Sequence, residues 1–163
     1  MIRTAIITLS DKGSKGERED ESGLVIRGMI AGIGAVVEHY EVLPDEKALI
    51  AETLARLSDS CTIDLILTTG GTGVAPRDVT PEATLSVIDR ELPGMAEAMR
   101  SESLKKTSYA MISRAVAGVR KQTLIINLPG SPRAARENLA VVLPALSHAI
   151  EKIKGDPSDC ARA

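Results

Sequence analysis

Aromatic side chains are almost missing from this sequence, which has no Phe, no Trp and only Tyr40 and Tyr109 among 163 residues. Proteins that bind single-stranded nucleic acids use aromatic side chains as platforms on which the bases stack. The formal net charge of −2 also gives no support for a basic face that would bind a phosphate backbone. Both absences argue against a nucleic acid partner. They also predict a core built from aliphatic side chains.

Cysteine and long apolar runs are scarce as well. Cys61 and Cys160 are too few for a disulfide framework, and their setting is not that of a zinc site. No signal peptide precedes the first apolar segment, and no apolar run approaches the ~18 residues that a membrane span requires. We therefore expect a cytoplasmic protein with no membrane segment.

The length and composition are those of one globular domain. A chain of 163 residues can bury a substantial core but is too short for two comfortable domains. An apolar content of 44% with 26% charged residues is ordinary for a soluble protein. We predict a single domain over residues 1–155, followed by a C-terminal tail at 156–163.

Short apolar runs alternate with segments of helical periodicity, which predicts an α/β fold with a mainly parallel sheet covered on both faces. Strands are expected at residues 3–9, 36–43, 65–67 and 123–128. The first helix, capped by Asp20 or Ser22 and ending near Ile33, is expected to bury Leu24, Val25, Met29 and Ile33. Gly28 and Gly32, one turn apart, would allow that helix to pack closely on the sheet. Leu85 and Ile88 are expected to point inward from a later helix. Residues 109–119 fit neither period.

The most informative stretch is 65–82, in which a buried strand leads into Thr68, Thr69, Gly70, Gly71, Thr72 and Gly73. Thr80-Pro81 is typical of a helix N-cap and first turn. A glycine-rich loop beside a helix N-terminus can bind an anion through unpaired N–H groups. The loop is neither GxxxxGK[ST] nor GxGxxG, so a simple chain reversal remains an alternative. Arg77 and Asp78 favour a phosphate with its metal, although they could instead form a surface ion bridge.

Other polar residues follow the other strands, at the sheet edge where α/β proteins bind ligands. These are Ser10 and Asp11, Asp45, and the segment 127–131, where Ser131 can cap the last helix before Pro132. The pattern alone favours Asp45 as a helix cap over a second functional carboxylate. Residues 15–21 are expected to form a solvated loop, and His39 and His148 to be packed or surface residues.

No Cys or Ser is paired with a loop histidine, which argues against covalent acyl transfer. Two acids beside glycine-rich loops suit a nucleotide bound with Mg²⁺, and hence phosphoryl or nucleotidyl transfer. An attacking phosphate would need no general base, because its second pKa of ~6 leaves it ionised at pH 7.

Five segments carry a family resemblance: LPDE, GGTGVAPRDVTPEAT, PGMAEAMR, SRAVAGVR and INLPGSP. In this order and spacing they resemble the molybdopterin adenylyltransferase family, the Mog/MoaB-type domain that is also the G domain of gephyrin. The resemblance extends from Thr4 to about Gly155. It implies a three-layer α/β/α sandwich that assembles as a homotrimer. It also implies transfer of AMP from ATP to the terminal phosphate of molybdopterin, with release of pyrophosphate.

The resemblance also assigns site residues and partners. It implies that Asp45 and Asp78 are catalytic and bind Mg²⁺. The residues that it implies in nucleotide or pterin binding are Ser10, Asp11, Thr69, Gly70, Gly71, Thr72, Gly73, Pro93, Gly94, Met95, Glu97, Ser101, Ser113, Arg114, Pro129, Gly130 and Ser131. A molybdenum insertase and molybdopterin synthase are possible partners. PGMAEAMR resembles the Mog and gephyrin-type form. Two alternatives stay open, a MoaB-like pterin carrier or scaffold without turnover and a transferase with another acceptor.

Overall fold

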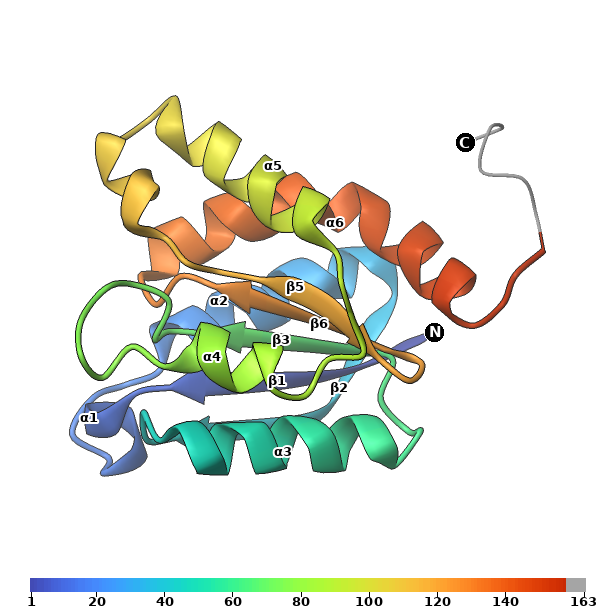
Figure 1. Cartoon of the computed structure of the whole chain (residues 1–163), viewed down its shortest axis with the longest axis horizontal. Coiled ribbons are helices and arrows are strands. Elements are labelled where there is room, and N and C mark those ends of the chain that lie inside the picture. The colour runs from blue at the N-terminus through green and yellow to red at the C-terminus, as the bar shows by residue number, and fades with distance from the viewer. Residues whose placement is uncertain (158–163) are drawn as a thin grey trace.

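Six strands form one mixed sheet in the computed structural model, which describes residues 1–157. Their order across the sheet is β2-β1-β3-β6-β5-β4 (Figure 1). The strands are β1 (Ile2–Leu9), β2 (Ala35–Leu43), β3 (Leu65–Thr69), β4 (Arg90–Glu91), β5 (Ala117–Arg120) and β6 (Thr123–Leu128). The neighbours from β2 to β6 run parallel, whereas β5 and β4 add antiparallel pairs at one edge. The prediction of a mainly parallel sheet is confirmed.

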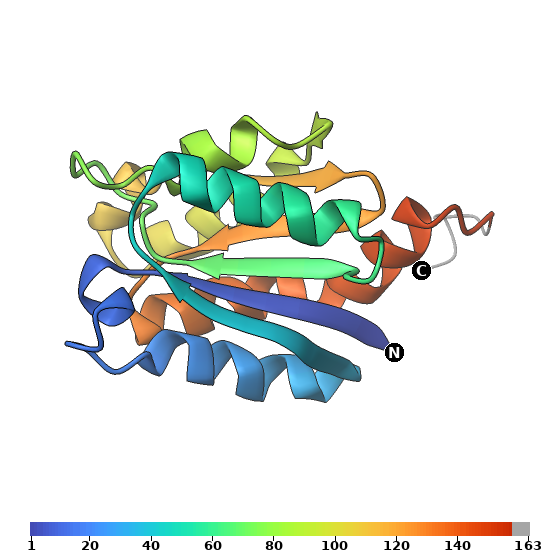
Figure 2. The same ribbon diagram turned by 90° about the horizontal axis from the view of Figure 1, so that it is seen from below.

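Helices cover both faces of this sheet. They are α1 (Asp11–Ser14), α2 (Glu21–Ile30), α3 (Lys47–Asp59), α4 (Thr80–Leu85), α5 (Pro93–Leu104) and α6 (Pro132–Ile153), with 3₁₀ turns η1 (Ala31–Ile33) and η2 (Ser108–Ile112). Helices α2, α5 and α6 pack on one face, and α3 and α4 on the other (Figures 1 and 2). The expected three-layer α/β/α architecture is confirmed. Among the described residues, none of the helices has the length and apolar character to cross a membrane.

The strands divide their apolar side chains between two cores with a period of two. In β1, Ile6 belongs to the core beneath α2, α5 and α6, whereas Ile7 belongs to the core beneath α3 and α4. Both side chains are fully buried. Both cores are aliphatic, as predicted. Cys61 is exposed, and Cys160, with most of the predicted tail, lies outside the described residues.

The buried side of α2 was predicted correctly only in part: Met29 and Ile33 pack against the core, partly buried, as expected, whereas Leu24 does not. Asp20 caps this helix, as expected, by accepting from the Gly23 N–H group. With the helix fixed in this phase, Ile26 and Ile30 are fully buried, whereas Leu24 is 54% exposed. Gly28 has open space around it, so it serves no close packing.

Two further predictions about packing, for Leu85 and Gly32, were wrong. Leu85 is exposed because α4 ends at that residue. Gly32 lies in η1 and, like Gly28, has no neighbour that a side chain would meet. The predicted last helix is confirmed, with Leu139, Val142, Leu146 and Ile150 buried and Pro144 in its interior.

A buried carboxylate joins three elements at the sheet edge opposite the carboxyl ends of the parallel strands. Asp64, 2% exposed directly before β3, accepts from the Arg3 backbone N–H at 2.8 Å and from the Arg3 guanidinium at 2.9 Å. Lys154, just after α6, lies 2.8 Å from the same carboxylate. Burial alone would raise the pKa of Asp64, but these donors and charges outweigh it and lower the pKa to about 2.

We expect Asp64→Asn to lower the free energy of unfolding at pH 7 by about 2 kcal/mol, the equivalent of that pKa shift. Because the folded pKa lies below the unfolded pKa, the carboxylate's contribution is complete above the unfolded value and is lost as pH falls through about 2. Urea unfolding from pH 7 to pH 2 should show the variant and the parent converging at low pH. Glu52→Gln, an exposed acid on α3, is the control. A difference that does not change with pH would contradict this account.

Candidate functional site

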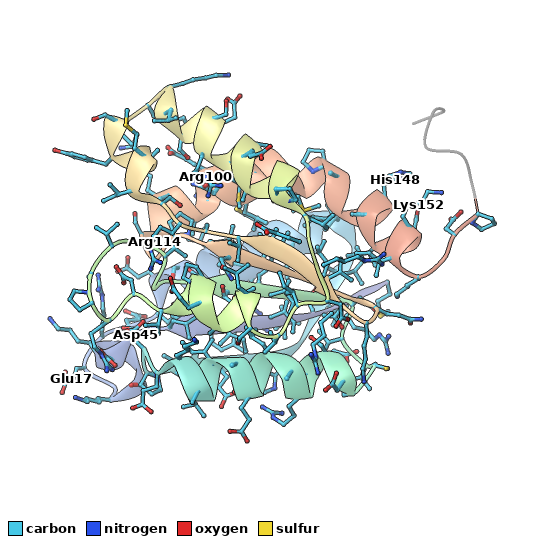
Figure 3. The ribbon with its side chains drawn as sticks, viewed as in Figure 1. Glu17, Asp45, Arg100, Arg114, His148 and Lys152 are labelled. Carbon is cyan, nitrogen blue, oxygen red and sulfur yellow. The ribbon has the colours of Figure 1, made fainter. Side chains whose placement is uncertain are left out.

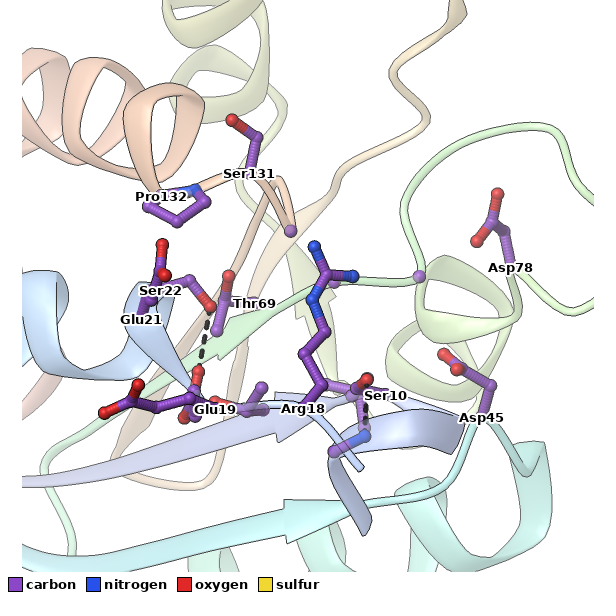
Figure 4. A pocket seen from close by; sticks show the side chains of 17 residues that line it. Ser10, Arg18, Glu19, Glu21, Ser22, Asp45, Thr69, Asp78, Ser131 and Pro132 are labelled. Carbon is purple, nitrogen blue, oxygen red and sulfur yellow. Dashed lines mark hydrogen bonds between the residues drawn. The ribbon is translucent and has the colours of Figure 1, made fainter. Parts of the chain in front are cut away.

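Four loops meet around a cavity of about 480 Å³ at the carboxyl edge of the parallel strands (Figure 4). Its walls include Ser10 after β1, Asp45 after β2, the segment 69–71 at the end of β3, and Gly130 with Ser131 after β6. The predicted convergence of these loops on one edge is therefore confirmed. Ser131 also caps α6, as predicted, by accepting from the Ala134 N–H group.

Glycines allow the loops to approach one another at this edge. Gly70 has φ +103°, and a Cβ there would overlap the carbonyl oxygen of Leu9. A Cβ at Gly130 would lie 3.2 Å from the Cα of Gly70. The ends of β1, β3 and β6 thus meet at backbone contact distance, which only glycine permits. Within the described chain, the backbone N–H groups of Gly71 and Gly73 donate to no other group and remain available to a ligand.

Two residues that were predicted as helix N-caps have other roles. Thr80 is the first residue of α4 and not its N-cap, and its hydroxyl donates to the Gly70 carbonyl at 2.9 Å. Asp45 does not cap α3, whose N-cap is Glu46. Both side chains are used in tertiary contacts with other loops, which sequence periodicity does not reveal.

Asp11 and Asp45 hold each other through a reciprocal pair of hydrogen bonds. The Asp11 N–H donates to the Asp45 carboxylate, and the Asp45 N–H donates to the Asp11 carboxylate, each at 3.1 Å. Burial raises the pKa of Asp45, and the negative charges of Asp11 and Asp78 raise it further. Asp45 is therefore a carboxylate in an environment that favours a cation beside it.

Arg77 pairs with Asp11 and not with its sequence neighbour Asp78. Its Nε and Nη2 donate to the two Asp11 oxygens at 2.9 and 2.7 Å, in a bidentate arrangement. This pair lowers the pKa of Asp11. The Arg77 side chain is largely exposed and that of Asp11 partly so. Arg77 thus forms a surface ion bridge, but its partner is Asp11 and not the Asp78 that was considered.

Arg114 fixes the loop that carries Asp78. Its guanidinium donates to the Gly73 carbonyl at 2.6 Å, to the Asp78 carbonyl at 2.7 Å and to the carboxylate of Glu82. Its backbone N–H donates to the Thr72 carbonyl. One side chain therefore joins both ends of the 73–78 loop to α4. Arg114 and Asp45 lie toward the same edge of the molecule, whereas His148 lies on α6 toward the opposite end (Figure 3).

The remaining residues implied by the resemblance divide into two groups. A second cavity, of about 220 Å³, is lined by Thr72, Gly73, Ser113 and Pro129, among others. The glycine-rich loop contributes to both cavities, with residues 69–71 lining the first and Thr72 and Gly73 the second. Pro93, Gly94, Met95, Glu97 and Ser101 belong to α5 and line neither of these two cavities.

One wall of the first cavity was missed from the sequence. Arg18, Glu19, Asp20, Glu21 and Ser22 line it. Residues 15–19 are an exposed loop, as expected, but their position beside the cavity was not predicted. Asp20 anchors this segment, accepting from the Thr8 hydroxyl at 2.6 Å and from the Tyr40 hydroxyl. The available signal was the Asp20 cap, since a fixed helix start also fixes the residues before it.

We expect Gly70→Ala to destabilise the fold by about 3 kcal/mol, because it combines a positive φ with overlap at the Leu9 carbonyl. Gly28→Ala is the matched control. It adds the same methyl group at an open helix position and should stabilise the protein by about 0.5–1 kcal/mol. Urea unfolding of the two variants measures the difference, and equal stability would contradict the close approach at Gly70.

Comparison with known proteins places these features in a family. The family model described as "Probable molybdopterin binding domain" matches residues 5–148. The molybdopterin adenylyltransferase of Helicobacter pylori strain J99 is 43% identical over 157 residues, which cover 95% of this chain and 89% of that protein. The Escherichia coli K12 protein of the same name is 43% identical over 88% of this chain and 75% of its own length. The crystal structure of the molybdopterin biosynthesis enzyme MoaB from Thermus thermophilus superposes with a TM-score of 0.90 at 53% identity, over 98% of this chain and all of that one. The chain belongs to the molybdopterin-binding domain family.

Proposed function

We propose that this protein is a Mg²⁺- and ATP-dependent molybdopterin adenylyltransferase in molybdenum cofactor biosynthesis. The observation that carries the proposal is the pair of carboxylates, Asp45 and Asp78, on the wall of one cavity that also has glycine N–H groups available for an anion. Relatives at 43% identity over most of the chain bear the name of this enzyme, which supports the same reaction here.

The reaction requires positioning and charge neutralisation more than acid–base chemistry. An oxygen of the molybdopterin phosphate forms a bond to the α-phosphorus of ATP. The bond from that phosphorus to the bridging oxygen of the β-phosphate breaks, and pyrophosphate leaves with the electron pair. The attacking phosphate is largely ionised at pH 7, so no side chain has to remove a proton.

The donor set of the cavity suits Mg²⁺. The cavity is lined by five carboxylates, those of Glu19, Asp20, Glu21, Asp45 and Asp78, and by one cationic side chain, Arg18. Such a site would repel a polyphosphate unless a cation entered with it. Mg²⁺ is commonly held by one or two carboxylates together with substrate phosphates. Among residues 1–157, no three acidic, His or Cys side chains are close enough together to hold a metal ion by themselves, so Mg²⁺ would need oxygens of the substrate as further ligands.

Asp45 and Asp78 are the residues that we propose as ligands. Asp45 Oδ2 accepts from the Asp11 N–H and Asp78 Oδ2 accepts from the Ala75 N–H. The Oδ1 atom of each makes no hydrogen bond within the described residues and could serve a metal. When bound, the metal supplies neutralisation of the phosphate charge. The chain's own contribution is to hold both carboxylates and the loop N–H groups in place.

A carrier or scaffold that binds the pterin without turnover is the alternative. It is raised by the similarity to a MoaB structure, although that protein too is described as an enzyme. The two functions differ in one measurable respect, since a carrier would form no adenylylated pterin. The homotrimer, the cytoplasmic location and exchange with molybdopterin synthase and a molybdenum insertase stay predictions, of which light scattering can test the first.

We expect Asp45→Asn and Asp78→Asn each to lower turnover by about 10²–10³-fold, because each removes a charge that stabilises the bound phosphates. Purified protein would be incubated anaerobically with molybdopterin and Mg-ATP and assayed for adenylylated pterin and pyrophosphate. Glu52→Gln controls for the loss of an acid elsewhere. Full activity in either site variant, or failure of Asp78→Asn to fold, would contradict the assignment of these two residues to the site. Pterin binding without product in the parent protein would favour the carrier function.

Asp45→Asn should also raise the melting temperature at pH 7. The pKa of Asp45 is raised in the folded state, so its ionised form opposes folding above that pKa. The amide removes the charge but keeps an acceptor for the Asp11 N–H. Because the penalty is absent where Asp45 is protonated, the gain should shrink as pH falls through its folded pKa. A gain that is the same at every pH would assign the effect to another cause.

A further inference from the structure

The first cavity has one cationic side chain among the residues that line it, Arg18. It belongs to the segment between α1 and α2. In the view of Figure 4 its guanidinium extends among the lining side chains, between the Ser10 and Ser131 turns, with Asp45 and Asp78 to one side. Neither the glycine-rich loop nor the turn before α6 adds a lysine or arginine to the cavity wall.

Arg18 is also not engaged elsewhere. Four acids lie within three positions of it in sequence, Glu17, Glu19, Asp20 and Glu21. Even so, no ion pair or hydrogen bond within the described residues uses its guanidinium. Two other arginines near this cavity are already paired, Arg77 with Asp11 and Arg114 with the 73–78 loop. An arginine that faces a cavity with its donors free is available to a ligand.

The groups on the facing walls indicate the chemistry of that ligand. The N–H groups of Gly71, Gly130 and Ser131 make no hydrogen bond within the described chain, and Ser131 directly precedes the 22-residue helix α6. Ser131 is the N-cap of that helix, which itself starts at Pro132. Unpaired N–H groups at a helix N-terminus favour an anion. A planar guanidinium opposite them can bind two oxygens of one phosphate group.

We propose that Arg18 is a phosphate-contacting residue, which binds a phosphate group of the substrates across the cavity from the Gly70–Gly71 and Gly130–Ser131 loops. This inference rests on the proposed adenylyl transfer and adds a ligand-binding residue to it. A metal held by Asp45 and Asp78 would neutralise phosphate charge at one side of the cavity. Arg18 supplies positive charge at the other side. ATP and the pterin both carry phosphate groups, and both present the same chemistry to Arg18.

The segment that carries Arg18 is anchored but not buried. Asp20 is fixed by hydroxyl groups of β1 and β2, whereas Arg18 itself is exposed. The guanidinium is thus tethered two residues from a fixed point and can still adjust to a ligand. Because its exposed side chain has no partner to lose, substitution of Arg18 should leave the fold intact.

Binding of inorganic pyrophosphate with Mg²⁺ to the full chain, measured by calorimetry at constant ionic strength, tests the proposal directly. We expect Arg18→Gln to weaken binding about tenfold, and Arg18→Lys to restore part of it, because lysine keeps the charge but not the fork. Lys12→Gln is the control, since it removes the same charge from an exposed position on α1 that does not line the cavity. Equal affinities for Arg18→Gln and Lys12→Gln would overturn the proposal.

Steady-state kinetics then identify the source of the phosphate. A rise in KM for ATP in Arg18→Gln, with kcat changed much less, would assign the contact to the nucleotide, and a rise in KM for molybdopterin would assign it to the pterin. No change in either KM would overturn the contact. If the parent protein fails to form product, adenylyl transfer is wrong, and the pyrophosphate titration still decides the role of Arg18.

Discussion

The ends of three parallel strands approach so closely at Gly70 that no side chain fits between them. A Cβ there would overlap the Leu9 carbonyl of β1, and Gly130 after β6 lies against the Gly70 Cα on the other side. The Gly70 carbonyl is in turn fixed by the Thr80 hydroxyl of α4. This one contact sets the position of the glycine-rich loop relative to Ser10, to the N-terminus of α6 and to the segment that carries Asp78. The geometry of the site therefore depends on the lack of a side chain at Gly70 as much as on any functional group.

The electrostatics of the site oppose the stability of the fold. Asp11, Asp45 and Asp78 are close enough for the charges of two to raise the pKa of the third. Arg77 offsets part of this repulsion, but it pairs directly with Asp11, and among the described residues the more buried Asp45 has no ion-pair partner. At the opposite edge Asp64 is almost completely buried, yet it has Arg3 and Lys154 as partners. Asp64 therefore belongs to a structural ion pair, whereas Asp45 belongs to a site in which the ligand supplies the missing positive charge.

Much of the architecture could be predicted from the sequence, because it is encoded locally. Apolar runs identified β1, β2, β3 and β6, and the pairing of Ser131 with Pro132 identified the start of α6. Parallel topology then brings every strand's carboxyl end to one edge. The prediction for α2 was correct for Met29 and Ile33, which pack against the core, but wrong for Leu24. Asp20 is fixed by Thr8 and Tyr40, and the helix that it caps turns Ile26 inward and Leu24 outward.

The site was less predictable, since its side chains bond across long separations in sequence. Thr80 and Asp45 have the residue types of helix caps, yet their partners are Gly70 and Asp11 in other loops. Arg77 bonds across 66 positions and Arg114 across 36 and 41. Sequence neighbours such as Arg77 and Asp78 consequently have separate functions, one bridging two loops and the other facing the cavity. A motif such as GGTGVAPRD identifies the loop, whereas the fold decides which of its charges remain free to meet a phosphate.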